Sequence, residues 1–246
     1  MISIREVSRT FGHGPEAVTA LDRLSLDVSP GEFVCIVGAS GCGKSTLLSL
    51  VAGLDTPSSG IIEAGPNPAL MFQEPALFPW LTVAGNVGLP LKLRKVPRPA
   101  REARVAELLA TVNLSDFAGK RPHELSGGMR QRVALARTLA LDSPVLLMDE
   151  PFGALDAMTR DLLHDELERI TQERGLTVLF VTHNVREAAR LGDRIVLLSS
   201  RPGRLKWQGS VDIPGHAGST PRGLGAGRRG HRPAPRGGGP ACRVTP

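Results

Sequence analysis

The chain has 246 residues, of which 30 are basic and 24 acidic, so its formal net charge is +6. The whole excess lies in residues 214–246, which hold six arginines and no acidic residue, so residues 1–213 are neutral and offer no general basic surface for nucleic acid. This tail also holds nine Gly and six Pro and is expected to be disordered, whereas residues 1–213 suffice for one large α/β domain.

Two further classes of protein are disfavoured. No apolar run approaches the ~20 residues that a membrane-spanning helix needs, and Met1–Val7 contains an acidic residue and lacks the apolar core of a secretory signal.

The three cysteines, Cys35, Cys42 and Cys242, are too far apart for a metal site built on cysteine pairs, and their odd number favours a reduced, cytoplasmic chain. Cys35 is expected to fill a buried strand position.

Short apolar runs alternate with amphipathic stretches, which is typical of a mainly parallel sheet covered by helices. The strands expected in chain order are Ile2–Val7, Leu24–Val28, Phe33–Gly38, Ala69–Phe72, Val145–Asp149, Thr177–Thr182 and Arg194–Leu198. The helices expected from apolar spacing are Ala100–Asn113, Met129–Ala140 and Thr159–Arg174, the last of them ending at a left-handed Gly175. A turn at 200–203 should precede a hairpin of Leu205–Trp207 against Val211–Ile213. Residues 75–141 lack strand character and are interpreted as a helical subdomain inserted into the α/β core.

A glycine-rich loop with a lysine stands between a buried strand and a helix. Residues 38–46 fit the pattern G-x4-G-K-[ST]. Backbone N–H groups of such a loop can wrap a polyphosphate, the lysine adds a full charge, and the Ser45 hydroxyl can bind Mg²⁺. A glycine-rich turn without a ligand is disfavoured, because strand, loop and helix follow in register. We expect a nucleoside triphosphate to be held by Gly38, Ala39, Ser40, Gly41, Cys42, Gly43, Lys44, Ser45 and Thr46.

Two adjacent carboxylates end the apolar run Val145–Met148. Ligands of open α/β sheets bind at the carboxyl ends of the strands, where Asp149 and Glu150 would lie. Asp149 would hold the hydration shell of Mg²⁺, and Glu150 would polarise the attacking water. A lone acid at this place would more often cap a helix, but two of them in a chain with a phosphate-binding loop favour catalysis.

The segment Leu125–Met129, Leu-Ser-Gly-Gly-Met, leads into an amphipathic helix and forms a second anion-binding helix terminus. Because the chain has a single phosphate-binding loop, one bound nucleotide cannot obviously contact both of these helix N-termini in the same chain. The economical solution is a twofold dimer, in which each triphosphate lies between the loop of one copy and Ser126, Gly127 and Gly128 of the other. Closure of the dimer would then convert ATP binding into a mechanical stroke.

With these motifs, residues 1–213 resemble the ATP-binding cassette (ABC) family of P-loop NTPases. The resemblance implies an α/β fold with a mainly parallel core sheet, an antiparallel β edge and the inserted helical subdomain, and ATP with Mg²⁺ as cofactors. Gln73 matches the glutamine that contacts Mg²⁺ and water and joins the core to the helical insert, and His183 matches the histidine that contacts the γ-phosphate. Asp156, in Ala154-Leu155-Asp156, matches the loop that crosses the dimer seam in the family, and Phe11 is the candidate for the aromatic residue that stacks on adenine.

Within the family, residues 74–87 resemble the import ATPases of the nitrate, sulfonate and taurine group. In such importers the surface from Gln73 to Trp80 receives a short helix of the membrane permease, so Pro79 and Trp80 would be apolar contact residues; the alternative is that Trp80 packs inside the helical subdomain. The resemblance thus implies the ATP-hydrolysing subunit of a multi-subunit importer, a homodimer or a pair with a paralogue, peripheral at the cytoplasmic face of the membrane. It would work with a separate permease and, indirectly, an extracytoplasmic solute-binding protein. The ATPase does not touch the solute, so nitrate, sulfonates, taurine and related small molecules stay open, and a preference for organic sulfonates rests on resemblance alone.

The chain departs from the family pattern in two places. The segment Gly60–Phe72 is short, so a β-hairpin there is expected to be trimmed. In residues 214–246, 25 of 33 residues are Gly, Pro, Arg or Ala, which are the residues available from codons made only of G and C. One interpretation is a shifted reading frame of a GC-rich gene or an unselected extension, and the other is a basic arm that binds anionic lipid.

Two other classes of protein are alternatives. A soluble ABC ATPase acting on nucleic acid usually carries a long coiled-coil insert or two cassettes, whereas the segment between Gln73 and Leu125 has no heptads, so no nucleic-acid partner is expected. A small-molecule P-loop kinase would leave Leu125–Met129 unexplained. Salt-dependent binding of DNA or RNA by residues 1–213 would favour the first class, and phosphorylation of a metabolite the second.

Overall fold

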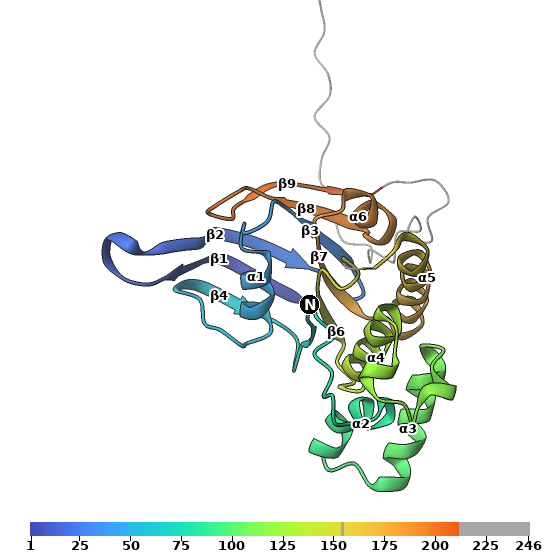
Figure 1. Cartoon of the computed structure of the whole chain (residues 1–246). Helices are drawn as coiled ribbons and strands as arrows, with labels where there is room; N and C mark the ends of the chain where they lie inside the picture. The colour runs from blue at the N-terminus through green and yellow to red at the C-terminus, as the bar shows by residue number, and fades with distance from the viewer. Residues whose placement is uncertain (154, 212–246) are drawn as a thin grey trace, which may run out of the picture.

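The computed structural model describes residues 1–153 and 155–211, in which two sheets lie on either side of one helix (Figure 1). The smaller, antiparallel sheet has the order β2-β1-β4 and consists of β1 (Ile2–Phe11), β2 (Val18–Val28) and β4 (Ser59–Glu63). The larger sheet has the order β5-β6-β7-β3-β8-β9 and consists of β5 (Ala69–Met71), β6 (Val145–Asp149), β7 (Thr177–Thr182), β3 (Phe33–Val37), β8 (Arg194–Leu198) and β9 (Leu205–Ser210). Its first five strands are parallel and β9 is antiparallel to β8, which confirms the expected fold class.

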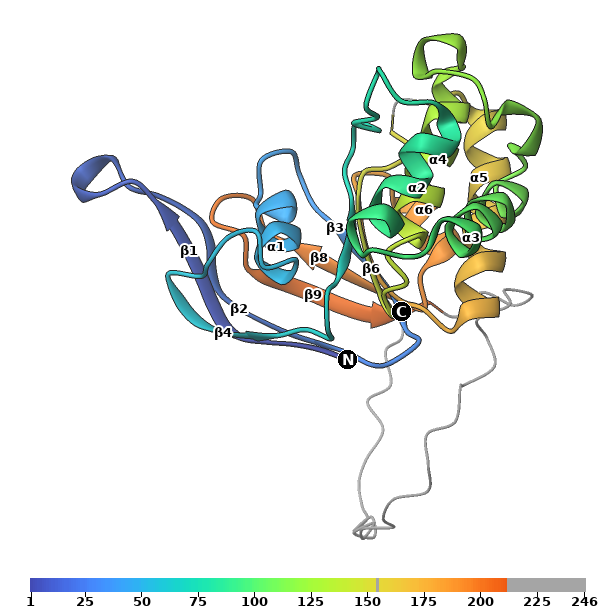
Figure 2. The same cartoon turned by 90° about the horizontal axis from the view of Figure 1, so that it is seen from below.

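Both faces of the larger sheet are covered by apolar side chains, which explains the uninterrupted apolar runs of its strands. In β3, Val34 and Ile36 pack with the smaller sheet and with α1 (Lys44–Val51), which lies between the two sheets. Phe33, Cys35 and Val37 alternate with them and pack on the other face, where α5 (Ala157–Arg174) and α6 (Val185–Leu191) lie (Figure 2). Cys35 is fully buried, as expected, and this burial raises the pKa of its thiol well above its usual range.

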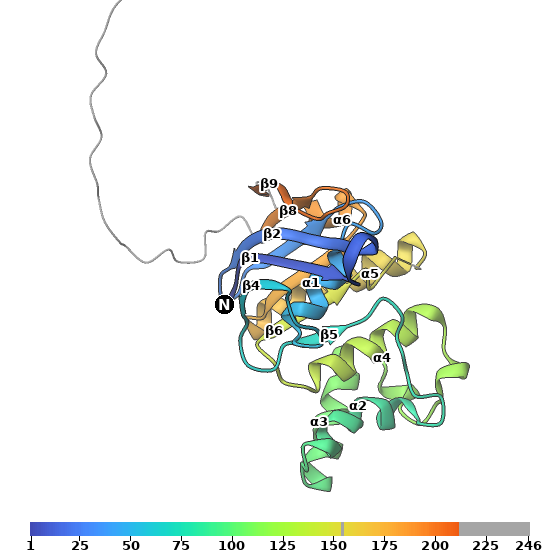
Figure 3. The same cartoon turned by 90° about the vertical axis from the view of Figure 1, so that its left-hand side faces the viewer.

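Residues 75–141 form the expected helical subdomain, composed of α2 (Val83–Leu93), α3 (Arg98–Thr111) and α4 (Gly127–Leu139). Figure 3 shows α2 and α3 projecting away from both sheets, while α4 runs back toward β5. The apolar spacing did not predict α2, because Gly85, Gly88 and Pro90 lower its helix propensity. The helix is held instead by tertiary contacts: Thr82 caps it by accepting the Gly85 N–H, and the fully buried Asn86 bonds the preceding loop.

The observed elements differ from the predicted ones at several places. The strand β4 and the helix α6 were not predicted, and β4 pairs with β1, so residues 60–72 contain no hairpin of their own. The predicted hairpin of 205–207 against 211–213 is wrong, because β9 runs unbroken from Leu205 to Ser210 and pairs with β8. Gly175 has the predicted left-handed conformation, with φ of 60°. The tail 214–246, together with residues 212 and 213, lies outside the described residues.

None of the helices in residues 1–153 and 155–211 combines the length and the apolar character needed to cross a membrane.

Candidate functional site

Three neighbouring parallel strands carry the predicted site residues at their carboxyl ends. The strand β7 pairs on one side with β3, which leads into the glycine-rich loop 38–46, and on the other with β6, which ends at Asp149. Because parallel strands end at the same edge of a sheet, the loop, the pair Asp149–Glu150 and His183 meet there. The sheet order therefore assembles residues that are more than a hundred positions apart in the chain.

A cleft of about 460 Å³ opens at this edge. It is lined by Val18, Ala20, Ser40, Gly41, Gly43, Lys44, Ser45, Thr46, Gln73, Asp149, Glu150 and Arg201. Nine of these were predicted from the motifs, but Val18, Ala20 and Arg201 were not. No local pattern marks the first two, because only the position of β2 beside the loop makes them part of the cleft, and Arg201 stands in a turn that the sequence identified only as a turn.

The glycine-rich loop has a left-handed backbone that favours glycine at two positions. Gly41 and Gly43 have φ of 73° and 96°, and a Cβ on Gly43 would lie 2.7 Å from the carbonyl oxygen of Ala20. Lys44 is buried and folds back over the loop, where its Nζ donates to the carbonyl oxygens of Gly38 at 2.9 Å and Ala39 at 3.0 Å. The loop therefore presents a positive charge and the N-terminus of α1 to the same cleft, an arrangement that suits a polyphosphate.

The two carboxylates of the cleft have different surroundings. Burial raises the pKa of Asp149, an effect that its hydrogen bond with the Ser45 hydroxyl partly offsets. Glu150 has a positive φ of 42°, which is rare for a residue other than glycine. Its Oε2 lies 2.7 Å from Nδ1 of His183 and its Oε1 lies 3.7 Å from Nζ of Lys44. Glu150 is thus held between a cation of the loop and the imidazole that follows β7.

The oxygen donors beside the loop suit a hard divalent cation such as Mg²⁺. Asp149 and Ser45 already share a hydrogen bond, and Gln73 lines the same cleft. No group of three or more His, Cys, Asp or Glu side chains able to hold a metal exists in the part of the chain that the structure describes. A site with so few protein ligands fits Mg²⁺, which keeps several waters and takes phosphate oxygens, better than an ion that needs a full cage of side chains.

Gln73 connects the cleft to the helical subdomain, as predicted. Its carbonyl oxygen accepts a hydrogen bond of 3.0 Å from the buried Gln131 of α4. Arg137, also of α4, donates to the carbonyl oxygens of Pro75 and Ala76, which follow Gln73 in the chain, both at 2.7 Å. Burial lowers the pKa of Arg137, but its guanidinium stays charged at neutral pH. These hydrogen bonds are therefore charge-assisted. A movement of α4 would therefore be transmitted to Gln73.

Ser126, Gly127 and Gly128 lie outside the cleft of their own chain. Ser126 is the N-cap of α4 and its Oγ accepts the Met129 N–H at 3.2 Å, while both Ser126 and Gly127 are exposed. The predicted seam residue Asp156 is likewise exposed and absent from the cleft lining; the Thr159 N–H that it accepts at the start of α5 lowers its pKa. Ser126, Gly127 and Asp156 are therefore available to a second molecule, whereas Gly128 is buried.

The two predicted aromatic contact residues, Phe11 and Trp80, are both exposed. Phe11 is 43% exposed at the end of β1, where the guanidinium carbon of Arg9 lies 4.6 Å from its ring centroid, and it does not line the cleft. Trp80 is 69% exposed and its ring centroid is 5.4 Å from that of Phe78. The alternative that Trp80 packs inside the helical subdomain is therefore wrong.

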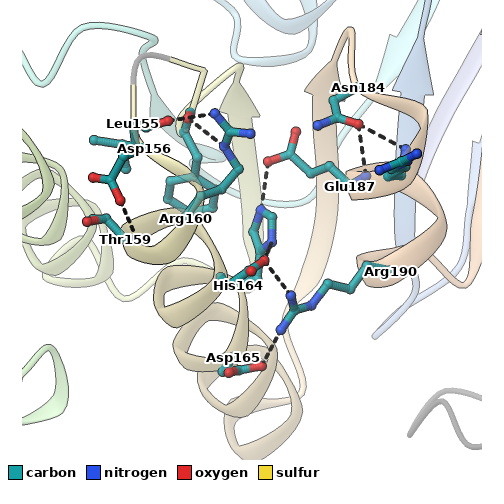
Figure 4. A network of polar contacts seen from close by, with 12 residues as sticks. Leu155, Asp156, Thr159, Arg160, His164, Asp165, Asn184, Glu187 and Arg190 are labelled. Atoms are coloured by element: carbon teal, nitrogen blue, oxygen red, sulfur yellow. Dashed lines mark hydrogen bonds and ion pairs between the residues drawn. The ribbon is translucent and has the colours of Figure 1, made fainter.

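A polar network beside His183 in the chain joins α5 and α6, and Figure 4 shows its members Asn184, Glu187 and His164. Glu187 of α6 accepts hydrogen bonds from the Thr182 hydroxyl and pairs with Nε2 of His164 of α5 at 2.7 Å. Asn184 donates its N–H to Thr182 Oγ1 at 3.0 Å, so both neighbours of His183 are held by this network. The motifs did not point to His164, because a single histidine on a helix carries no pattern.

The chain is similar to known ATP-binding proteins. The sequence profile described as ABC transporter matches residues 21–153. The nitrate import ATP-binding protein NrtD of a Synechocystis strain is 45% identical over 222 residues, which cover 87% of this chain and 84% of that protein. The taurine import ATP-binding protein TauB of Burkholderia pseudomallei is 46% identical over 217 residues, which cover 85% of this chain and 84% of that protein.

Two solved structures have a similar fold. A dimeric bacterial ABC transporter cassette superposes with a TM-score of 0.77 at 35% identity, over 87% of this chain and 100% of that one. A dimeric post-hydrolysis state of a cassette, bound to ADP and Pi, has a TM-score of 0.75 at 33% identity, over the same shares of the two chains.

Proposed function

The chain belongs to the ABC transporter family, and from this premise we propose that it is the ATP-hydrolysing subunit of an importer, working as a homodimer on a separate membrane permease. Its reaction is the hydrolysis of ATP to ADP and phosphate. The family match and the similar structure bound to ADP and Pi both agree with this reaction. The observation that carries the proposal is the cleft itself, in which a lysine-bearing loop faces two carboxylates at one sheet edge, one of them bonded to the imidazole of His183.

The glycine-rich loop would hold the triphosphate. Its backbone N–H groups and the N-terminus of α1 would bind the phosphate oxygens, and Lys44 would exchange its present carbonyl partners for them. Thr46 would contact the phosphate nearer the nucleoside. Phe11 would stack on adenine through the ring face opposite Arg9. It does not line the cleft itself, but it pairs in β1 with Val18 of β2, which does.

The carboxylates would divide two tasks between them. Asp149, with Ser45 and Gln73, would hold Mg²⁺, which would neutralise charge on the phosphate oxygens. Glu150 would accept the proton of the attacking water, and His183 would orient Glu150 and contact the γ-phosphate. The positive φ of Glu150 supports this role, because strained backbone of this kind is concentrated at functional sites.

A second copy would complete the site. Ser126, Gly127 and Gly128 carry a helix N-terminus that no group of their own cleft uses, and Asp156 is exposed beside them. In a head-to-tail dimer of twofold symmetry these residues would cover the triphosphate bound by the partner's loop. The similarity to a dimeric cassette supports this arrangement. A paralogous ATPase could take the place of the second copy.

The surface from Gln73 to Trp80 would receive the permease. Trp80 and Phe72 are exposed, at 69% and 49%, and the segment is bonded to α4 through Pro75 and Ala76. Next to it, a mainly apolar groove of about 410 Å³ begins at Leu81 and continues between α2 and α3. A short permease helix that packs here would follow the movement of α4. The subunit would then lie peripherally at the cytoplasmic side of the membrane.

The transported solute is proposed from the relatives alone. Similar proteins are named for nitrate, taurine or bicarbonate transport, so a small solute of the nitrate, sulfonate or taurine type is proposed. A solute-binding protein outside the cell would select it. Uptake of each of these solutes by membranes that contain this subunit with its permease would identify it.

The shared nucleotide site can be tested by two substitutions with different expected effects. In a Glu150→Gln background, which slows hydrolysis, ATP should convert the monomer to a dimer, measured by light scattering after size exclusion. Adding Lys44→Ala should abolish both ATP binding and dimer formation. Adding Ser126→Arg should abolish the dimer but leave ATP binding to the monomer intact. A dimer that survives Ser126→Arg would refute the shared site.

A further inference from the structure

The turn between β8 and β9 is held against the glycine-rich loop by backbone contacts. Gly203 donates its N–H to the carbonyl oxygen of Ala20 at 2.8 Å and accepts the Asp22 N–H at 3.0 Å. A Cβ on Gly203 would lie 2.2 Å from the carbonyl oxygen of Cys42, so only glycine allows this close approach. Ser199 closes the turn through hydrogen bonds with Pro202 and Arg204. The turn is therefore fixed in position beside the loop.

This turn carries Arg201 into the lining of the cleft. Its Nε donates to the carbonyl oxygen of Gly41 at 2.9 Å. A Cβ on Gly41 would lie 2.6 Å from Nη2 of Arg201, so the glycine leaves the room that the guanidinium occupies. Arg201 and Lys44 are thus two cations placed on one phosphate-binding loop, from segments far apart in the chain.

The guanidinium of Arg201 lacks an acidic partner in residues 1–153 and 155–211, although Asp149 and Glu150 line the same cleft. By contrast, Arg204, three positions along the same turn, pairs with Asp22 through Nε at 2.9 Å and through Nη2. Among the described residues, only the Nε–H of Arg201 has a hydrogen-bond acceptor, which leaves the Nη groups of a planar, permanently charged fork for a ligand. Phosphate oxygens are the acceptors that such a fork binds best.

We infer that Arg201 is a further nucleotide-binding residue of this chain, which donates from its Nη groups to the phosphate oxygens of the nucleotide while its Nε remains bonded to Gly41. The inference rests on the proposed nucleotide site at the glycine-rich loop and adds to it a contact from the β8–β9 turn. Because the turn is tied to β2 and to the loop, the guanidinium is positioned before the nucleotide arrives, and little entropy is lost on binding.

The affinity of the full chain for ADP and ATP tests this inference, since ADP binding by a monomer does not depend on a second copy. Arg201→Gln is expected to weaken the binding of both nucleotides about tenfold, as is typical for the loss of a partly exposed charge-assisted hydrogen bond. Arg201→Lys should recover part of the loss, because a lysine keeps the charge but not the fork. Arg204 lies on the same turn as Arg201, and Arg204→Gln breaks its pair with Asp22 of β2. This variant is the matched control, and its affinity for both nucleotides should stay within about twofold of the wild type.

The outcomes separate the inference from the site on which it rests. If Lys44→Ala binds nucleotide like the wild type, the proposed site itself is wrong. If Lys44→Ala fails to bind while Arg201→Gln, with an unchanged melting temperature, binds ADP and ATP like the wild type, only the role of Arg201 is refuted. If Arg201→Gln keeps monomer affinity but loses the ATP-dependent dimer, the guanidinium contacts the second copy instead of the nucleotide, which also overturns the inference.

Discussion

Substitution of Gly128 by alanine probes the contact that holds the start of α4 against the start of α5. A Cβ at this position would lie 2.5 Å from Cγ2 of Thr159, far inside van der Waals contact. Thr159 cannot turn the methyl away freely, because its hydroxyl and its N–H both bond the carboxylate of Asp156. The two helices must therefore separate, or Thr159 must give up a hydrogen bond.

Overpacking of this kind costs typically about 1–3 kcal/mol. For a domain of this size each kcal/mol lowers the melting temperature by about 2–4 °C. Gly128→Ala is therefore expected to melt several degrees lower than the wild type. ATP hydrolysis should fall as well, because the shift displaces the exposed Ser126 and Gly127 from the position in which the proposed dimer needs them.

Thermal unfolding of four proteins measures the effect: the wild type, Gly128→Ala, Thr159→Ser and the double variant. Serine lacks the clashing methyl but keeps the hydroxyl, so the double variant should recover most of the loss, with a coupling energy of about 1 kcal/mol or more. Gly127→Ala is the matched control, because its Cβ would lie at an ordinary 3.8 Å from Leu155 and should not lower stability. Strictly additive effects of the two substitutions would refute the clash as the cause.

Three further predictions concern the carboxylates and the network beside His183. Glu150→Gln should lower kcat by about 10²- to 10⁴-fold with little change in ATP affinity, and near-normal turnover in steady-state assays would exclude Glu150 as the base. Burial raises the pKa of Asp149, so the folded protein keeps this proton to a higher pH than the unfolded chain does, and the charged form lowers stability at neutral pH. Asp149→Asn without nucleotide should therefore unfold at higher denaturant than the wild type at pH 7, with the gain shrinking as the pH falls through the raised pKa, while ATP hydrolysis is lost; an equal gain at every pH would contradict the assignment. His164→Ala leaves the buried Glu187 one partner short and should lower both stability, by about 1–3 kcal/mol, and kcat, with ATP KM nearly unchanged. His164→Gln, whose amide can still donate to Glu187, should restore kcat, and failure of this rescue would show that the pair does not position His183.

The central motifs could be identified from the sequence, because they are defined by residues that lie close together in the chain. The glycine-rich loop is defined by backbone conformations at Gly41 and Gly43 and by the lysine that follows, all within nine residues of one strand end. The carboxylates Asp149 and Glu150 follow directly from the apolar run before them. The helices predicted from apolar spacing, α3, α4 and α5, have a continuous apolar face, whereas α2, interrupted by glycines and a proline, was found only in the structure.

Long-range pairing decided the rest. The order of the strands places β7 between β3 and β6, and only this order brings His183 to Glu150. The contact of Arg201 with Gly41 joins residues 160 positions apart, and neither segment carries a pattern that refers to the other. The spacing of residues along the chain indicates strands by a period of two residues and helices by a period of 3.6 residues, and it identifies single turns by their residue types. The adjacency of distant turns depends instead on how the sheets and helices pack, and so it is a property of the folded molecule.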